Sequence, residues 1–182
     1  MKKLFTIIIT LLVMSSCSTT KEARSAKDEA RIQKKAIEEA VIKNAVESKR
    51  YIIKFNRLFY TYGGMAELIP RANYLIIDGE KAILSTAYVG RQYDIKPIAA
   101  INMRGRAADY AVTDNLNKGT YDIKLKVMNQ GTVSFSVVIN IGKNGNCSAS
   151  VSSLKIDNVR YSGYLVPIPG NSISGNDPGN SI

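Results

Sequence analysis

The chain has 182 residues, 45% of them hydrophobic, which is enough for one domain with a sizeable core. Its 25 Lys and Arg residues outnumber its 15 Asp and Glu residues, for a formal net charge of +10. This excess is spread along the chain and does not form the block of like charges that is typical of a nucleic-acid-binding arm. We therefore expect a solvated basic surface, and we expect no nucleic acid partner. The absence of histidine excludes His-based triads and His metal ligands, and the absence of tryptophan removes the best stacking platform for a sugar.

Residues 1–16 have the pattern of a bacterial lipoprotein signal peptide. A positively charged start precedes an apolar run and two serines before Cys17. The apolar run is too short to cross a membrane as a helix, which takes about 20 residues, and it has the length of a secretory signal. The segment Met14-Ser15-Ser16-Cys17 resembles a lipobox, in which the cysteine is lipidated and becomes the first residue, although Met14 stands where Leu is usual. An uncleaved core segment followed by an incidental cysteine is the alternative.

The residues around the two cysteines bear on location and redox state. Surface-directed lipoproteins of this kind usually carry acidic residues after the lipidated cysteine, whereas Ser18-Thr19-Thr20-Lys21 follows Cys17. We therefore predict an anchor in the outer membrane that faces the periplasm. With Cys17 lipidated, Cys147 is the only thiol left, so no internal disulfide is expected. Cys147 lies on the apolar side of an alternating run and should be a small buried residue.

Residues 21–49 contain neither Gly nor Pro and are expected to be helical. Residues 17–36, with the lipid, should form a spacer about 30 Å long if helical. The second half of the helix should dock on a sheet through its crowded apolar residues: Ile37, Val41, Ile42, Ala45 and Val46. The opposite face carries charges of alternating sign four residues apart: Lys35, Glu39, Lys43 and Glu47. A heptad coiled coil and a membrane-surface helix fit less well, because the apolar period is not sustained and no aromatic residue lies on the apolar side.

Residues 37–166 are predicted to form an antiparallel β domain with this docking helix. The clearest signal is a hairpin of two alternating runs, 121–127 and 133–141, joined by a turn that contains Asn129 and Gly131. Asp78-Gly79 marks a second hairpin. Further strand-like runs are 51–59, 74–77, 81–84, 98–103, 108–113, 147–151 and 159–164. The predicted fold class is α+β, mostly β: an N-terminal helix followed by a curled antiparallel sheet, as a sandwich or half-barrel. Residues 167–182, rich in Gly, Asn and Ser, should be a disordered tail.

Three segments of this β domain, residues 74–79, 87–93 and 159–164, resemble the domain of unknown function 4251, a family of Bacteroidota envelope lipoproteins. The resemblance covers about residues 48–166. The family motif, similar to Pro-Tyr-Phe-Gly-Arg before a small aromatic segment, is matched by Tyr88, Gly90, Arg91 and Tyr93. Ala87 and Val89 depart from its Pro and Phe. The resemblance implies the fold and the envelope location, and it implies no activity.

Tyr88, Gly90, Arg91 and Tyr93 are also the candidate binding residues of the chain. Two phenols and a guanidinium at a glycine bend could form a ligand-binding corner, since Tyr and Arg often contribute most to binding energy. The alternative is a structural turn in which Arg91 pairs with a neighbouring carboxylate such as Asp94.

No catalytic, cofactor or metal site is predicted. The carboxylates fall mostly in turns or on wet strand faces, and no local spacing holds two of them at the ~5–9 Å separation of a glycosidase pair. No phosphate loop, Cys pair or calcium-loop pattern is present. The predicted function is a membrane-anchored envelope lipoprotein that acts as a non-catalytic binding or scaffold module, with a protein or an acidic cell-wall partner. A carboxylate-dependent envelope hydrolase is the alternative.

Overall fold

The computed structural model describes residues 19–60, 63–90, 100–129 and 134–169, with helix side chains from Asp28 onward. In these residues the protein is mostly antiparallel β with one N-terminal helix, which confirms the predicted composition of the fold. The elements are α2 (Thr19–Glu47), β1 (Arg50–Phe59), β2 (Met65–Glu67), β3 (Tyr74–Asp78), β4 (Lys81–Ala87), β5 (Ala100–Asn115), β6 (Thr120–Met128), β7 (Ser134–Gly142), β8 (Asn146–Ser153) and β9 (Ile156–Pro167).

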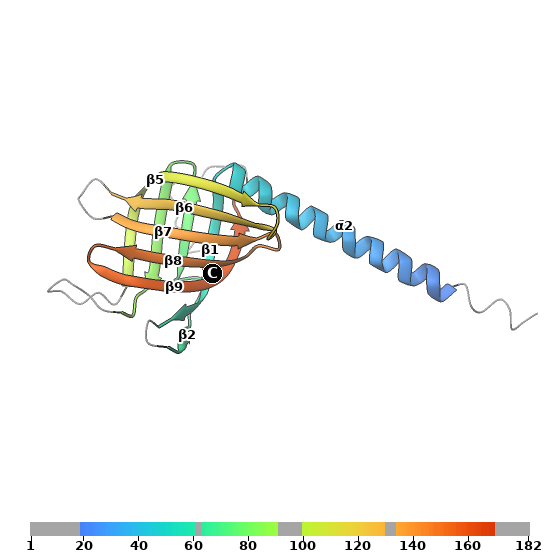
Figure 1. Cartoon of the computed structure of the whole chain (residues 1–182), viewed down its shortest axis with the longest axis horizontal. Helices are drawn as coiled ribbons and strands as arrows, with labels where there is room; N and C mark the ends of the chain where they lie inside the picture. Colours follow the sequence, from blue (N-terminus) through green and yellow to red (C-terminus); the bar gives the residue numbers. More distant parts are fainter. Residues whose placement is uncertain (1–18, 61–62, 91–99, 130–133, 170–182) are drawn as a thin grey trace, which may run out of the picture. The chain divides into compact units, whose positions relative to one another are not determined.

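The strands close into an eight-stranded barrel, where the sequence predicted a sandwich or half-barrel. Each strand from β3 to β9 pairs with the next, and β1 pairs with both β3 and β9, so the ring is complete (Figure 1). The short strand β2 adds to the end of β1, where Phe59 lies opposite Met65. The closure was not predicted because it depends on the pairing of β1 with β9, the first and last strands of the barrel.

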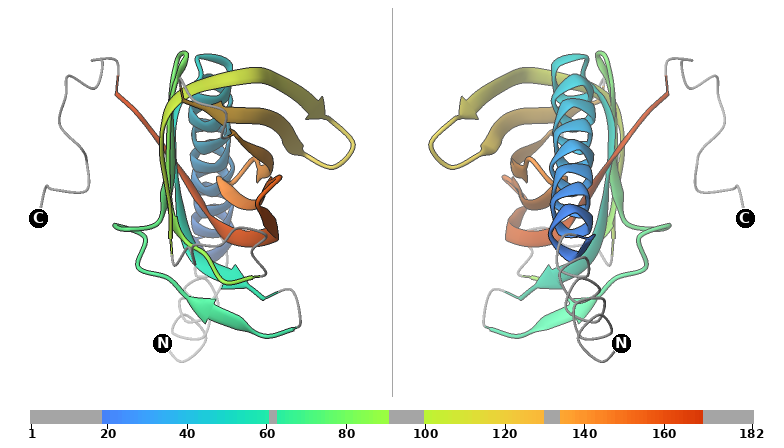
Figure 2. Two further views of the ribbon diagram at one scale, coloured as in Figure 1. Left: turned by 90° about the vertical axis from the view of Figure 1, so that its left-hand side faces the viewer. Right: turned by 90° about the vertical axis from the view of Figure 1, so that its right-hand side faces the viewer.

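The long strand β5 forms one corner of the barrel. Its first part, up to Arg106, pairs with β4, and its second part, from Arg106 on, pairs with β6. Figure 2 shows it curving from one side of the barrel to the other. At the bend a Cβ on Gly105 would lie 2.5 Å from the Met128 carbonyl carbon, so only glycine allows the two backbones to come this close. The sequence predicted two separate strands here, 98–103 and 108–113, because it did not reveal this continuous bend.

The pairing of β9 with β1 is a second place where the backbones come close. A Cβ on Gly163 would lie 2.8 Å from the Lys54 carbonyl carbon and closer still to its oxygen. The register of the two strands shifts between Phe55 and Arg57, which marks a bulge in β1. Glycine and bulge together allow β1 to bend and complete the ring.

Large apolar side chains fill the interior of the barrel, because alternate residues of each strand point inward. Along β7, Phe135, Val137, Ile139 and Ile141 are all buried, as the predicted hairpin requires. The largest fully buried side chains include Tyr51, Ile53, Phe55, Leu84, Ile123, Ile139 and Tyr161. Each apolar side chain of this size contributes about 1.5–3 kcal/mol through burial.

The structure divides into two compact units within α2, after Ile37. In the second unit Ile42, Ala45 and Val46 of α2 are buried in the core, which confirms the docking predicted for them. Val41 is 45% exposed, so the prediction that it also docks is wrong, and Ile37, which is 65% exposed, belongs to the other unit. The docking stripe is narrow because only positions 42, 45 and 46 share one side of the helix.

The predictions for the two ends of the chain, the signal segment with Cys17 and the tail from Gly170 on, concern residues outside the described ones. The β domain itself extends slightly past its predicted end at residue 166, since β9 runs to Pro167 and the Ile168 N–H donates to the Arg50 carbonyl over 3.2 Å. In the described part of the chain, no helix has the length and apolar character needed to cross a membrane.

Candidate functional site

The outer face of β8 carries unusually small side chains. The strand alternates Cys147, Ala149 and Val151, which are buried, with outward-facing serines, among them Ser148 and Ser150. Serine side chains are short, so the molecular surface over a strand that presents serines outward lies lower than the surface over neighbouring strands with larger side chains. The face of β8 is therefore the floor of a shallow groove.

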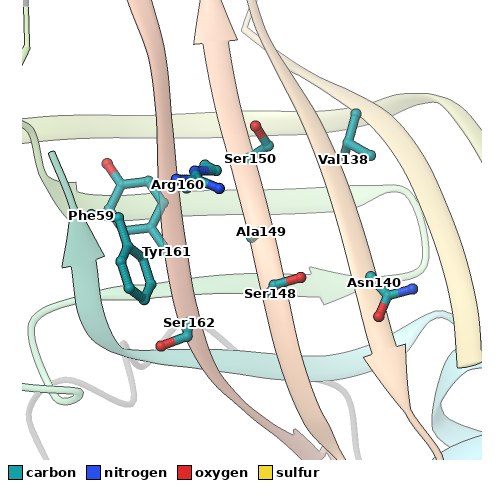
Figure 3. Close-up of a pocket in the computed structure, with 9 residues that line it drawn as sticks. All are labelled: Phe59, Val138, Asn140, Ser148, Ala149, Ser150, Arg160, Tyr161 and Ser162. Atoms are coloured by element: carbon teal, nitrogen blue, oxygen red, sulfur yellow. The ribbon is translucent and has the colours of Figure 1, made fainter. Parts of the chain in front are cut away.

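Larger side chains on the neighbouring strands form the two walls of this groove. The register places Ser150 between Val138 of β7 and Arg160 of β9, and Arg160 is followed by Phe59 of β1. Figure 3 shows Arg160 and Phe59 on one side of the serines and Val138 with Asn140 on the other. The groove has a volume of about 430 Å³ and is lined by Phe59, Val138, Asn140, Ser148, Ala149, Ser150, Arg160, Tyr161 and Ser162.

Among the described residues that line the groove, Arg160 is the only charged one. Its guanidinium carbon lies 6.0 Å from the centre of the Phe59 ring, within range of a cation–π contact. Arg160 is exposed, and in the described part of the chain it has no carboxylate within ion-pair distance. The positive charge is therefore available to a ligand.

Two of the serines that line the groove already donate their hydroxyl protons. The Ser150 hydroxyl donates to Asn158 Oδ1 over 2.5 Å, and the Ser162 hydroxyl donates to Asn56 Oδ1 over 3.4 Å. A hydroxyl oxygen that donates its proton keeps lone pairs that can accept a hydrogen bond. These two serines can therefore accept N–H donors from a bound molecule.

The structure describes two of the four residues of the predicted binding corner, Tyr88 and Gly90. Tyr88 is only 3% exposed and belongs to the core, so its ring is not part of an exposed binding surface. A Cβ on Gly90 would lie 2.7 Å from the Tyr88 hydroxyl oxygen, which places that hydroxyl directly against the bend. Arg91 and Tyr93, together with Asp94, lie outside the described residues.

Three of the described carboxylates, Asp78, Asp109 and Asp122, have a local partner. Asp78 pairs with Arg50 at 3.1 Å, and Asp109 pairs with Lys126 at 2.9 Å, which lowers the pKa of Asp109. Asp122 accepts hydrogen bonds from Asn115 over 2.6 Å and Asn140 over 2.5 Å. None of them lines the groove. Among the described residues, no three His, Cys, Asp or Glu side chains come together as metal ligands.

Cys147 is buried, as predicted, on the inner side of β8. Burial raises the pKa of its thiol from the ordinary 9.0 to about 12, so it is protonated at neutral pH. A protonated, buried thiol is a poor nucleophile.

The sequence contained part of the signal for the groove. The outward serines of β7 and β8 were recognised as a polar face, but the hollow depends on which large side chains stand beside them. That follows from the register across β7, β8, β9 and β1, and the last of these pairings was not predicted.

Comparisons with known proteins agree with the sequence resemblance. A family model described as a domain of unknown function, DUF4251, matches residues 33–165. The chain is similar to the crystal structure of a DUF4251 family protein from Bacteroides eggerthii DSM 20697, with a TM-score of 0.61 and 13% sequence identity over 72% of this chain and 89% of that chain. An identity this low supports the fold alone. No curated protein matches the sequence.

Proposed function

Because the chain belongs to the DUF4251 family, whose description assigns no activity, we propose a function from the groove and from the N-terminal sequence. The protein is a non-catalytic binding module of the cell envelope, held at a membrane by a lipid on Cys17. The groove over β8 carries this proposal, with an arginine that pairs with none of the described carboxylates. It is the described feature that combines a hollow, an available charge and hydrogen-bonding groups, which are the ordinary requirements of a ligand site.

Binding is favoured over catalysis by the types of residue in the groove. Its hydroxyl groups belong to Ser148, Ser150, Ser162 and Tyr161, and a serine needs a neighbouring base to become a nucleophile. Within the described part of the chain, no Lys, Asp, Glu or Cys lines the groove, and the full sequence contains no histidine. The Tyr161 hydroxyl is directed inward, where it donates to the Ala87 carbonyl over 2.9 Å, and its burial raises its pKa.

The N-terminal sequence supports the membrane anchor. Met14-Ser15-Ser16-Cys17 follows a short apolar run, as in a lipobox. Two or more acyl chains on such a cysteine make an essentially permanent anchor, because each buried methylene contributes about 0.8 kcal/mol. The segment Ser18-Thr19-Thr20-Lys21, directly after Cys17, contains no acidic residue, which favours the periplasmic side of the outer membrane as the location.

The proposal can be tested by filling the groove. Ser148 is exposed at the centre of the floor, and Phe is well tolerated at an outward strand position, so Ser148→Phe should fold while blocking the groove. A photo-crosslinking amino acid at Val138, which lines the groove and is 44% exposed, would report what binds there in intact envelopes. We expect Ser148→Phe to reduce the crosslinked species at least tenfold.

Ser136→Phe is the matched control for this experiment. Ser136 is an exposed, outward serine of β7 that does not line the groove. Crosslinking should therefore stay at the level of the unsubstituted chain. Equal crosslinking in both variants, with unchanged circular dichroism, would show that the groove is not the binding site.

A further inference from the structure

The dimensions of the groove fit an extended chain that lies across the strands. Its first row of outward residues runs from Val138 through Ser150 and Arg160 to Phe59, one residue from each of four neighbouring strands. Strands lie about 4.8 Å apart, so the row spans about 14 Å, the length of about four residues of extended peptide. Asn140, Ser148 and Ser162 form a second, parallel row that widens the floor.

The positive charge of Arg160 favours a ligand that carries an anionic group on the β9 side of the groove. Arg160 has no carboxylate partner in the described part of the chain, and a guanidinium pairs well with a carboxylate through two parallel hydrogen bonds. Asp122, in the strand beyond Asn140, does not compete for it because its two carboxylate oxygens are held by asparagine side chains. Among the described residues no acid competes for Arg160, so a carboxylate on the ligand would suit it.

The polar and aromatic groups favour a peptide over a sugar. Ser150 and Ser162 already donate their protons, so they offer acceptors to the N–H groups that a peptide carries. A sugar is usually held on an open aromatic ring. One face of the Phe59 ring is turned to the Arg160 guanidinium and only its remaining surface is free for an apolar side chain, and Tyr161, the other described aromatic residue of the lining, is completely buried.

We infer that the groove binds a short, extended peptide segment that carries a carboxylate, with the carboxylate paired to Arg160. This inference rests on the proposed binding function and adds the chemical class of the ligand. The apolar side chains of such a peptide would contact Val138 at one end of the row and Phe59 at the other.

The test uses two forms of one probe, Ala-Ala-Ala-Val labelled at its N-terminus with an uncharged fluorophore and ending in a free carboxylate or in an amide. Binding to the full chain, purified in detergent, is followed by fluorescence anisotropy. A charge-assisted hydrogen-bond pair should make the carboxylate form bind about tenfold tighter than the amide form. Arg160→Gln should remove this difference, and added salt should reduce it.

Arg71→Gln is the matched control, because it removes one positive charge from an exposed residue that does not line the groove. It should leave the tenfold preference intact. A preference that falls equally in both variants would mean that net charge alone attracts the probe, and it would overturn the assignment to Arg160.

Ser148→Phe separates this inference from the proposed function. If both probe forms bind equally and Ser148→Phe abolishes the binding of both, the groove is a binding site but the carboxylate assignment is wrong. If Ser148→Phe leaves a real preference unchanged, the site lies elsewhere and the proposed function of the groove is also wrong. If neither form binds to the unsubstituted chain at millimolar concentration, the peptide class is wrong.

Discussion

Replacing Gly163 by alanine should destabilise the barrel more than any comparable change in a turn glycine. The added Cβ would lie 2.8 Å from the Lys54 carbonyl carbon and 3.0 Å from the Phe55 Cα, and both of these atoms belong to the backbone of β1. A flexible side chain could rotate away, but a backbone can only shift as a strand. The two strands would have to separate where they close the ring.

The size of the effect follows from what this separation breaks. Two ladder hydrogen bonds near Gly163 would lengthen, at about 1 kcal/mol each. Overpacking of the crowded interior would lower the free energy of unfolding by about 1–3 kcal/mol more. Alanine has less conformational freedom than glycine in the unfolded chain, which raises the free energy of unfolding by about 0.4–1 kcal/mol. We expect a net loss of about 3 kcal/mol in the free energy of unfolding, measured by urea denaturation followed by circular dichroism.

Gly79→Ala provides the comparison. Gly79 has a φ of +63°, and no atom lies within 4 Å of the position that its Cβ would take. Alanine there meets only the strain of a left-handed backbone, about 1–2 kcal/mol, less the same entropic gain. If Gly163→Ala costs no more than Gly79→Ala, the close approach of β1 and β9 does not limit stability and the reasoning fails.

Two further predictions concern the cysteines. Cys17→Ala should move the protein from the membrane fraction to the soluble fraction of the envelope, and an unchanged need for detergent would rule out the lipid anchor. In that variant Cys147 is the only thiol, and at pH 8 it should react with an aromatic disulfide reagent only after unfolding in urea, because burial raises its pKa to about 12. Between pH 9 and 12 the unfolded thiol loses its proton and the folded one keeps it, so this group should lower the free energy of unfolding by about 1.4 kcal/mol per pH unit. Adding Cys147→Ala should reduce that slope, and an identical slope would contradict the burial argument.

Local signals predicted the parts of the fold that depend on neighbouring residues. The alternation in 121–127 and 133–141 identified β6 and β7, and Asp78-Gly79 identified the turn between β3 and β4. The buried positions of these strands also follow from alternation alone. Hydrophobic period and turn chemistry are properties of short segments, so a sequence shows them directly.

The barrel and the groove could not be predicted because both depend on contacts between distant segments. The bend of β5 at Gly105 matters only because the Met128 backbone lies against it. Arg160 was an ordinary exposed residue of a predicted strand until the register placed Phe59 beside it and serines across from it. The binding corner, by contrast, was proposed from residue types alone, and it included Tyr88, which the fold uses in its core.

The pairing of β1 with β9 also has a consequence for how the chain folds. All the pairings from β3 to β9 are between consecutive strands and can form as soon as each hairpin is made. The last pairing must wait for the whole domain, because β1 begins it and β9 completes it. Long-range pairing of this kind is slow, and until it forms both strands present unpaired edges that can join another chain. Closure of the ring should therefore be the late step of folding and the stage most exposed to aggregation, so the chain would need protection longest at these two strands.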